Sequence, residues 1–512
     1  MTSVGLWNIA REEPGLTAVV DPDGRTVTYG ELAAEADRIG RGLQALGLAA
    51  GDTVAMLLPN GADLLAVEFA TLETGLYSVP LNWHLTAAEI AYILRDSGAK
   101  VFIAHERFAA AAADAAAQAG VPAVFSVGEV PGFPPLASLG AGDNRPEPRT
   151  AGALMVYTSG TSGRPKGVRR PLTGLDPDDV PPVSLWFFGL FGLKPFDGNV
   201  HLCCSPLYHT AVMNFAVISL QLGHSVVVMD RWDPHEMLRL IERHRVTHSH
   251  MVPTQFRRLL ALPDDVRGAY DLSSMRVMIH GAAPCPHEVK RRMLDWWGPV
   301  VLEYYAASEG GGTLITAADW LDRPGSVGQA WPGSRVRVLD PEGNDAAAGQ
   351  PGTVYLQMGD ATFEYLGDPE KTRESWRGRM FTVGDIGYLD DEGYLYLCDR
   401  KSDIIISGGV NVYPAEIENE LAVHPAVADV AVFGIPHEEW GEEIKAVVQP
   451  EAGVQAGPEL TGELLAFLAG RLAKFKLPRS VDYVDELPRD PNGKLYKRLL
   501  RDPYWAGRER AI

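Results

Sequence analysis

The chain has 512 residues, which is more than a single hydrophobic core usually serves, so two or more domains are expected. Its hydrophobic content of 46% and charged content of 22% are ordinary for a globular enzyme. The formal net charge of -20 argues against nucleic acid as a partner, because a nucleic acid backbone needs a basic face, but it does not exclude a nucleotide held by a few local cations.

Neither a targeting segment nor a membrane-spanning segment is predicted. Residues 1–13 lack the basic and apolar stretches of a signal peptide. The most apolar window, residues 211–229, is interrupted by Asn214, Gln221 and His224, so we expect a buried helix followed by a strand. The chain has four cysteines, which are Cys203, Cys204, Cys285 and Cys398. They show neither disulfide density nor metal-ligand spacing, which favours a reduced, cytoplasmic location without integral membrane association.

The first third of the chain alternates short apolar runs with helical stretches. Strands are predicted at residues 26–29, 54–58, 101–104 and 123–127, and helices at residues 31–46, 62–74 and 106–119. The alanine-rich run at 106–119 is interpreted as a helix because alanine is the best helix former. Repeated units of this kind predict a largely parallel sheet covered by helices.

Later segments indicate a second sheet, a small β-rich region and a separate last part. Strands at 226–229 and 277–280 extend a second sheet. Residues 336–396 consist of short strands separated by Gly, Asp and Pro turns, which is typical of a small β-subdomain. The composition changes again near residue 404, after which we expect an α+β domain. The fold class predicted for the chain is α/β.

The most distinctive stretch is Tyr157-Thr158-Ser159-Gly160-Thr161-Ser162-Gly163-Arg164-Pro165-Lys166-Gly167-Val168. It follows an apolar run at 153–156 that is predicted to be a short buried strand. Small and hydroxyl-bearing residues leave exposed N–H groups, hydroxyl groups and one lysine, a combination that suits polyphosphate. A Gly/Ser surface hairpin is the alternative, but the pattern is long and ordered. A Walker A loop is excluded, because the G-x-x-x-x-G-K-[ST] spacing is absent.

This stretch resembles the phosphate loop of the adenylate-forming enzymes, a superfamily that contains acyl-CoA synthetases, luciferases and peptide-synthetase adenylation domains. The resemblance implies ATP as a substrate. The residues that it assigns to the ATP phosphates are Thr158, Ser159, Gly160, Thr161, Ser162, Gly163 and Lys166. Because the further motifs occur in the order of the family, the resemblance covers nearly the whole chain, and the acyl-CoA synthetase branch is favoured.

Two of these motifs lie in the middle of the chain. Pro206-Leu207-Tyr208-His209-Thr210 resembles the P-L-x-H element, in which His209 would border the acyl group and the pantetheine tunnel. His280-Gly281-Ala282-Ala283-Pro284 is similar to the adenine-site element, in which Gly281, Ala282 and Ala283 would let a flat base approach the backbone.

The stretch Glu303-Tyr304-Tyr305-Ala306-Ala307-Ser308-Glu309 resembles the Y-G-x-[ST]-E element. Tyr305 would stack on adenine, with Ala306 and Ser308 beside the nucleotide. Glu309, together with Thr158, would hold Mg²⁺, which prefers a few hard oxygen ligands. Ala306 departs from the family pattern, in which this position is usually glycine.

Two further elements are assigned to the ribose and to the domain hinge. Asp385 could accept both ribose hydroxyl protons, although a turn aspartate is the alternative, and Arg400 would assist at the ribose and phosphate. Ser402 falls where the family has its hinge, usually Asp or Lys. Gly408 and Gly409 resemble the loop that lines the pantetheine tunnel and would let CoA pass.

Near the end of the chain, Pro488-Arg489-Asp490-Pro491-Asn492-Gly493-Lys494 resembles the P-x-x-x-x-G-K element. Lys494 would bridge the substrate carboxylate and the α-phosphate, where charge develops during in-line displacement. The catalytic residues implied are therefore Lys494, Lys166, Glu309 and His209. The histidines at 244, 248 and 250 could suggest a metal site, but core or surface histidines are the favoured interpretation.

The resemblance implies two helix-flanked sheets and a β-subdomain in a large N-terminal domain, residues 1–401, followed by a mobile α+β C-terminal domain, residues 402–512. It implies a ligase that forms an acyl-adenylate from a carboxylic acid and ATP and then an acyl-CoA, with Mg²⁺ as cofactor. A homodimer is a further expectation.

Several alternatives stay open. The enzyme could load an acyl-carrier protein, could be an oxygen-using relative of luciferase, or could perform only thioesterification if Ala306 and Ser402 impair adenylation. A binding protein without turnover is the alternative from another class. The apolar residues that could line the acyl pocket, or simply form a core, are Trp186, Phe187, Phe188, Met213 and Phe215. They favour a hydrophobic acid over acetate or an amino acid.

Overall fold

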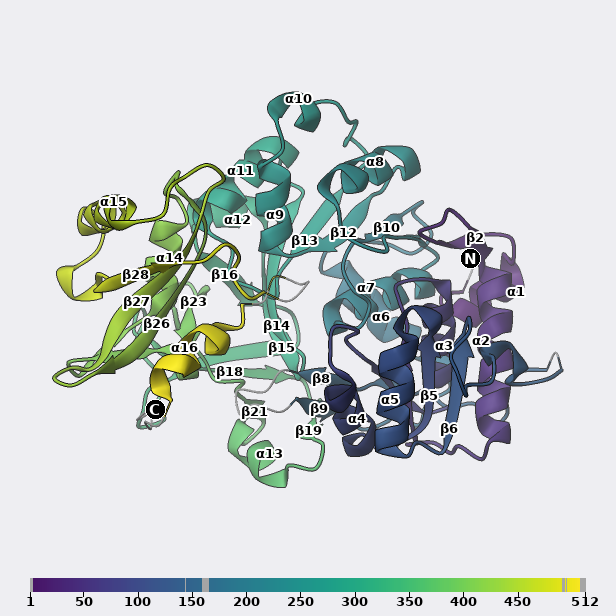
Figure 1. Cartoon of the computed structure of the whole chain (residues 1–512). Coiled ribbons are helices and arrows are strands. Elements are labelled where there is room, and N and C mark those ends of the chain that lie inside the picture. Colours follow the sequence, from purple (N-terminus) through teal and green to yellow (C-terminus); the bar gives the residue numbers. More distant parts are fainter. Residues whose placement is uncertain (1–2, 143, 159–164, 490–492, 494, 507–512) are drawn as a thin grey trace. The chain divides into compact units, whose positions relative to one another are not determined.

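The computed structural model describes residues 3–142, 144–158, 165–489, 493 and 495–506 (Figure 1). The chain divides into two compact units. The first unit comprises Met1–His250, Asp264–Met278 and Ala361–Glu374, and the second comprises Met251–Pro263, Ile279–Asp360 and Ser375–Ile512. The predicted domain boundary between residues 401 and 402 stays a prediction.

The first unit contains a five-stranded parallel sheet with the order β6-β5-β3-β4-β7. These strands are β3 (Thr53–Leu57), β4 (Tyr77–Pro80), β5 (Ala99–His105), β6 (Ala123–Val127) and β7 (Ala153–Leu154). The helices around them are α2 (Tyr29–Ala45), α3 (Ala62–Glu73), α4 (Ala87–Asp96) and α5 (Ala109–Ala119). Because side chains alternate along a strand, Val54 and Met56 pack with α2 and α3, whereas Ala55 and Leu57 pack with α4 and α5.

A second group of strands in the first unit follows the order β2-β1-β11-β10-β12. Its members are β1 (Thr17–Val20), β2 (Thr26–Thr28), β10 (Val200–Cys203), β11 (Ser225–Val228) and β12 (His248–Met251). The associated helices are α1 (Leu6–Glu12), α6 (Pro181–Gly189), α7 (Thr210–Gln221), α8 (Pro234–His244) and α10 (Asp264–Arg267). Buried residues of α1, α2, α3 and α7 form one continuous core with these strands.

A small three-stranded sheet, β19-β9-β8, completes the first unit. It consists of β8 (Val156–Thr158), β9 (Lys166–Arg169) and β19 (Glu364–Tyr365), and α13 (Pro369–Ser375) follows it. The strand predicted at 153–156 is therefore divided. The chain leaves one sheet after Leu154 and enters the other at Val156, and the buried side chain of Met155 lies between the two strands.

The second unit contains an antiparallel sheet with the order β14-β15-β16-β23-β22-β18-β21-β20, to which β17 adds by pairing with β18. Its strands are β14 (Val301–Ala307), β15 (Gly310–Ile315), β16 (Ser326–Ala330), β17 (Ser334–Leu339), β18 (Gly352–Met358), β20 (Trp376–Arg377), β21 (Met380–Phe381), β22 (Asp385–Leu389) and β23 (Leu395–Arg400). Strand β13 (Val277–His280) and helices α9 (Pro253–Leu260), α11 (His287–Trp297) and α12 (Ala317–Asp322) accompany it. The predicted β-rich region at 336–396 is confirmed.

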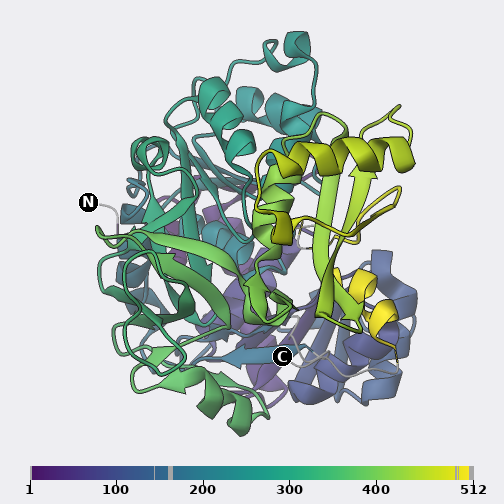
Figure 2. The ribbon, with the colours of Figure 1, turned by 90° about the vertical axis from the view of Figure 1, so that its left-hand side faces the viewer.

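The last part of the second unit is the predicted α+β region (Figure 2, light green to yellow). Its strands are β24 (Ile405–Ser407), β25 (Val410–Val412), β26 (Val427–His437), β27 (Gly441–Pro450) and β28 (Ser480–Tyr483), and its helices are α14 (Pro414–Leu421), α15 (Pro458–Ala469) and α16 (Lys497–Trp505). Helices α14 and α15 cover one face of the sheet, and α16 packs on the other. The predicted α/β class is confirmed by these sheets.

In the described part of the chain, short 3-10 helices connect the elements at Glu106–Phe108, Leu136–Ser138, Pro177–Asp179, Lys401–Asp403 and Lys474–Lys476. Among the described residues, every helix is too short or too polar to cross a bilayer.

Candidate active site

The stretch predicted to bind phosphate is flanked by two paired strands of the first unit. Strands β8 and β9 pair antiparallel, with Thr158 opposite Lys166 and Tyr157 opposite Gly167. The hydroxyl group of Tyr157 donates a 2.7 Å hydrogen bond to Asp96, which fixes the start of the hairpin to α4. The described residues on both sides of the predicted phosphate loop are therefore held together by strand pairing.

Several predicted site residues lie outside the described part of the chain. They are Ser159, Gly160, Thr161, Ser162 and Gly163 in the hairpin turn and Lys494 near the end of the chain. The side chain of Thr158 also lies outside it. The roles expected of these residues stay predictions.

Lys166, at the foot of the hairpin, forms an ion pair that the sequence pattern did not indicate. Its Nζ atom lies 2.5 Å from Oδ2 of Asp368, and the two side chains are 22% and 24% exposed. The other oxygen of Asp368 accepts a 3.0 Å hydrogen bond from the backbone N–H of Lys371 in the first turn of α13. The lysine ammonium group lowers the pKa of Asp368. The carboxylate is thus held in place and stays charged beside Lys166.

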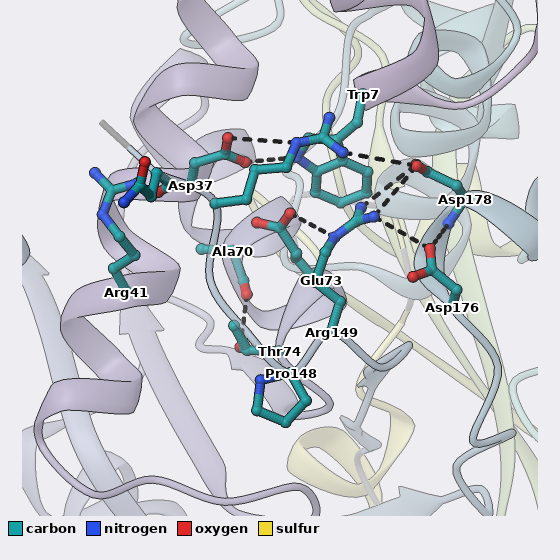
Figure 3. A network of polar contacts seen from close by, with 12 residues as sticks. Trp7, Asp37, Arg41, Ala70, Glu73, Thr74, Pro148, Arg149, Asp176 and Asp178 are labelled. Atoms are coloured by element: carbon teal, nitrogen blue, oxygen red, sulfur yellow. Dashed lines mark hydrogen bonds and ion pairs between the residues drawn. The ribbon is translucent and has the colours of Figure 1, made fainter. Parts of the chain in front are cut away.

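A buried network, the Arg149 cluster, anchors the chain on both sides of the hairpin (Figure 3). Arg149 precedes the hairpin, and its guanidinium group lies 2.8 Å from Glu73 of α3 and 3.2 Å from both Asp176 and Asp178, which follow the hairpin. The guanidinium carbon lies 4.9 Å from the ring centroid of Trp7 in α1. One arginine therefore joins the segments before and after the hairpin to two helices.

Asp37 of α2 completes the Arg149 cluster, which thus consists of Trp7, Asp37, Glu73, Arg149, Asp176 and Asp178. The indole N–H of Trp7 donates a 2.8 Å hydrogen bond to Asp37 (Figure 3). The side chain of Glu73 is completely buried, and this burial, together with the negative charge of Asp37, raises the pKa of Glu73 to about 9.

The predicted adenine element follows β13 directly. A Cβ atom at Gly281 would lie 2.7 Å from the carbonyl oxygen of Tyr304, so this position accepts only glycine without a shift. Ala282 has a φ of 65°, in the left-handed region that side-chain-bearing residues rarely adopt. Strain of this kind tends to occur at ligand-binding segments. The geometry of Gly281 and Ala282 thus supports a site for close approach of a ligand.

A buried ion pair lies next to this element. Lys290 of α11, which has no exposed surface, places Nζ 2.6 Å from Glu303 of β14 and 4.8 Å from the ring centroid of Trp320. Burial raises the pKa of Glu303, while Lys290 opposes this shift. Nε2 of His280 lies 3.7 Å from the same carboxylate. The pair therefore connects α11, the end of β13 and the strand that carries Tyr305.

Three residues predicted to bind the nucleotide meet in the second unit. The hydroxyl group of Tyr305 donates a 2.6 Å hydrogen bond to Oδ2 of Asp385. Asp385 begins β22, Arg400 ends β23, and the two residues pair across the ladder. Nε of Arg400 lies 3.5 Å from Oδ1 of Asp385. An aromatic ring, a carboxylate and a guanidinium group thus converge in the second unit.

The remaining residues of the Tyr305 motif lie in the turn between β14 and β15. Ala306 pairs with Gly312, and the register shifts between Ala306 and Ala307. Ser308 and Glu309 form the turn and are half-buried. Glu309 therefore presents a carboxylate at the end of the hairpin, which is a donor suited to Mg²⁺.

His209 directly precedes α7, at its N-cap position. Its ring centroid lies 4.4 Å from that of Tyr208. Of the residues considered for the acyl pocket, Phe188, Met213 and Phe215 are buried, whereas Trp186 and Phe187 are half-buried. Phe187 and Phe188 both pack against Phe215, with ring centroids 5.6 and 5.5 Å apart. The deeper aromatic residues belong to a core, and the other two lie closer to its surface.

Four histidines surround this aromatic core. His201, His224, His248 and His250 are buried. Desolvation lowers the pKa of His201 to about 3 and the pKa values of His224 and His250 to about 4, so these imidazoles are neutral at pH 7. Within the described residues, no group of three or more His, Cys, Asp or Glu side chains is arranged to hold a metal ion.

The predicted hinge and CoA loop are both in the second unit. Ser402 lies in the 3-10 helix Lys401–Asp403, and its carbonyl oxygen accepts a 3.4 Å hydrogen bond from Arg501 of α16. Gly408 and Gly409, with φ values of 59° and 79°, form the turn between β24 and β25. The backbone N–H of Gly408 donates to the carbonyl oxygen of Trp440 at 2.9 Å.

The stem of the turn that contains Lys494 in the sequence is described, although Lys494 is not. Arg489 and Leu495 pair antiparallel across this stem, and Tyr496 N–H donates a 2.8 Å hydrogen bond to the carbonyl oxygen of Pro488. Nη1 of Arg489 donates to the carbonyl oxygen of Gly493 at 2.6 Å. The described residues on both sides of Lys494 are thus joined by hydrogen bonds.

Sequence reasoning identified Tyr305, Asp385 and Arg400 but missed three charged residues that contact other motifs. Asp368 contacts Lys166, Lys290 contacts Glu303, and Asp429 contacts Arg489. For Asp368 a signal exists, since an Asp followed by Pro is typical of a helix start. No local pattern marks the other two.

Comparison with protein families matches most of the chain. The model of the AMP-binding enzyme family matches residues 6–365, and the model of the AMP-binding enzyme C-terminal domain matches residues 416–494.

Individual proteins are similar over nearly their whole length. The chain is 35% identical to a feruloyl-CoA synthase of Amycolatopsis sp, covering 97% of this chain and 98% of that protein. It is 33% identical to the fatty acid–[acyl-carrier-protein] ligase ScoC of Streptomyces coeruleorubidus, covering 98% and 96%. The crystal structure of ATP-bound MatB from Rhodopseudomonas palustris has a TM-score of 0.82 at 33% identity, covering 97% of this chain and 98% of that chain.

Proposed function

The chain belongs to the family of AMP-binding enzymes, and from this premise we propose that it activates a hydrophobic carboxylic acid with ATP and then transfers the acyl group to CoA. The sequence-based identification of the adenylate-forming superfamily, in its acyl-CoA synthetase branch, is confirmed by the same matches and by the relatives. ATP and CoA are its nucleotide substrates.

The reaction has two steps. In the first, an oxygen of the substrate carboxylate attacks the α-phosphorus of ATP, and the bond from that phosphorus to the leaving pyrophosphate oxygen breaks. In the second, the CoA thiol loses its proton and attacks the acyl carbonyl carbon, and AMP leaves. No covalent enzyme intermediate is needed, so positioning and charge neutralisation carry the catalysis.

The convergence of Tyr305, Asp385 and Arg400 is the observation that carries this proposal. The ring of Tyr305 would stack on adenine, and the Asp385 carboxylate would accept hydrogen bonds from the ribose hydroxyl groups in exchange for its bond to Tyr305. Arg400, whose Nε lies 3.5 Å from that carboxylate, would reach toward the phosphate. Gly281 and the strained Ala282 would border the base.

The catalytic roles are assigned to His209, Lys166, Glu309 and Lys494. Lys166 would neutralise the outgoing pyrophosphate, and Lys494 the charge on the α-phosphate. His209, ahead of α7, would border the acyl group. Mg²⁺ would be held by the Glu309 carboxylate with Thr158, and it would supply positive charge to the phosphates when bound.

The test measures pyrophosphate release with a panel of acids. We expect a higher kcat/KM for a medium-sized hydrophobic acid than for acetate or any α-amino acid, because aromatic side chains and neutral histidines gather around α6 and α7. Asp385→Asn should raise the KM for ATP. A higher kcat/KM for acetate or an amino acid than for every hydrophobic acid would contradict the proposed substrate class.

Loading of an acyl-carrier protein is the second candidate, and the similarity to ScoC favours it. Both acceptors end in the same pantetheine thiol, so the Gly408-Gly409 turn would serve either. Supplying pre-made acyl-adenylate with CoA in one reaction and with a phosphopantetheinylated carrier protein in another distinguishes the two. We expect faster acyl transfer to CoA.

We also propose a cytoplasmic location, which the absence of disulfides among the four cysteines supports. A homodimer stays a prediction, which light scattering of the purified protein would check.

A further inference from the structure

Asp429 of β26 is shared by two arginines that approach it from different segments. Nη1 of Arg257 in α9 lies 2.7 Å from Oδ1. Nε and Nη2 of Arg489 lie 2.5 Å from Oδ2 and 2.9 Å from Oδ1. Although burial opposes it, the two guanidinium groups lower the pKa of Asp429, so the carboxylate is charged at neutral pH. Arg257, Asp429 and Arg489 are called the Asp429 cluster below.

Arg489 extends the Asp429 cluster to the turn that contains Lys494. It pairs with Leu495 across the stem and donates to the carbonyl oxygen of Gly493, the residue directly before Lys494. Because the guanidinium group is planar and rigid, its bonds to Asp429 and Gly493 fix the stem relative to β26.

The turn also packs directly on α9. A Cβ atom at Gly493, which has a φ of 76°, would overlap with the side chain of Thr254 in the first turn of that helix. Thr254 and Arg257 lie one helical turn apart, so α9 contacts the stem both by packing and by an ion pair.

We propose that Arg257 is a positioning residue for acyl-adenylate formation, holding Asp429 and, through Asp429 and Arg489, the turn that carries Lys494. The proposal rests on the proposed function, since it takes Lys494 as the lysine of the first step. Asp429 and Arg489 both follow the predicted hinge at Ser402, whereas Arg257 precedes it. Rotation about the hinge would keep the bond between Asp429 and Arg489 and break only the bond to Arg257.

The test compares Arg257→Met with Arg258→Met. Arg258 is the next residue of α9, is exposed, and forms no ion pair within the described residues, so it is matched in helix, charge and size. ATP–pyrophosphate exchange reports the first half-reaction, and consumption of pre-made acyl-adenylate with CoA reports the second. Arg257→Met should lower the exchange rate roughly tenfold or more, as expected for loss of a charge-assisted hydrogen bond, and leave the second half-reaction within about twofold.

Rescue and control sharpen the comparison. Arg257→Lys should recover part of the exchange rate, because an ammonium group still donates to Asp429, and Arg258→Met should change neither rate. Equal losses in both half-reactions, or an unchanged exchange rate in Arg257→Met, would overturn the proposal. If Arg257→Met does not fold, the same comparison of the two half-reaction rates is made with Arg257→Lys.

A second measurement does not depend on activity. Hydrogen exchange at the amide of Tyr496, bonded to Pro488, reports opening of the stem. It should be faster in Arg257→Met than in Arg258→Met and the unmodified protein, and equal exchange would overturn the proposal. If the unmodified protein releases no pyrophosphate with any acid, the proposed function fails, while hydrogen exchange still decides this inference.

Discussion

The Arg149 cluster and the Asp429 cluster both consist of arginines and acidic residues, but one is centred on an arginine and the other on an aspartate. In the first, Arg149 is shared by three carboxylates and its side chain is 7% exposed. In the second, Asp429 is shared by two arginines that are 20% and 24% exposed. The first cluster lies entirely before the predicted hinge, whereas the second has members on both sides of it.

The difference shows that ion pairs between the same types of residue can be either permanent or separable. A buried arginine that loses its partners leaves charges without compensation, so the Arg149 cluster is expected to be permanent. In the Asp429 cluster the carboxylate is only 13% exposed, but it keeps its bonds to Arg489 when the partly exposed Arg257 leaves, so no buried charge loses all its partners. Burial and position in the chain, not residue type, decide which cluster is fixed and which is separable.

The largest effect expected on the separable side is that of Lys494→Ala. It should lower ATP–pyrophosphate exchange on the order of a thousandfold, because the charge developing on the α-phosphate loses a donor. Conversion of supplied acyl-adenylate to acyl-CoA should stay near the rate of the unmodified protein. Equal loss in the two half-reactions would show that the turn is not withdrawn between them.

On the fixed side, Arg149→Met should lower the free energy of unfolding by about 2 kcal/mol, because the buried carboxyl group of Glu73 loses its hydrogen-bond donor and Asp178 loses its nearest cation. Chemical denaturation measures this change. Arg11→Met is the matched control, since Arg11 lies 3.7 Å from Asp178 but is 53% exposed, and its loss should cost less than about 1 kcal/mol. Similar costs for the two variants would remove the distinction between the clusters.

Glu73→Gln tests whether Glu73 of the Arg149 cluster is protonated in the folded protein. In the folded state the pKa of Glu73 is raised to about 9, so the carboxyl group keeps its proton at neutral pH. In the unfolded state it releases this proton above its ordinary pKa of 4.5. Its contribution to stability is therefore fully present below about pH 4.5 and is lost as the pH rises through about 9.

Glutamine imitates the protonated acid, so the variant should lose less stability between pH 6 and pH 9 than the unmodified protein, by about 3.5 kcal/mol. Denaturation midpoints measured across this range are the readout. An equal decline in the two proteins would mean that Glu73 is ionised in the cluster.

The smallest effect is expected at Ala306, where the family pattern has glycine. Ala306→Gly could give the carboxylate more room beside the α-phosphate, and a displacement of about an ångström can change a rate on the order of a hundredfold. Because the register of β14 shifts just after Ala306, we expect the strand to accommodate the methyl group and the exchange rate to rise less than about threefold.

The readout supplies acid with ATP in one reaction and pre-made acyl-adenylate in another, each with CoA. Ala306 impairs adenylation if the unmodified protein consumes the adenylate but not the acid, and if Ala306→Gly recovers turnover of the acid.

Local patterns predicted the elements well because they depend on neighbouring residues. The strand at 123–127 has the predicted bounds, and the helix expected at 31–46 begins at Tyr29. That earlier start has a signal in the sequence, since Thr28 and Glu31 form a capping box. The helix expected at 106–119 begins as a 3-10 turn, and α5 starts only at Ala109.

Contacts between distant residues could not be predicted in this way. Lys166 and Asp368 are separated by 202 positions, and Arg257 and Asp429 by 172. Motifs located Tyr305, Asp385 and Arg400, because Asp385 begins a strand of recognisable pattern and the other two lie in the last residues of one. Their partners are set by how the sheets pack, which a single sequence does not display.

The ion pair between Lys166 and Asp368 has a consequence for nucleotide affinity. A lysine that already has an anionic neighbour does not acquire its first counter-ion when a triphosphate arrives, but exchanges one for another. Ionic strength screens the attraction on both sides of that exchange, so the two effects partly cancel. Recognition of ATP at Lys166 would then depend less on salt than recognition by a solvated lysine, and it would favour ligands that carry more charge than a single carboxylate.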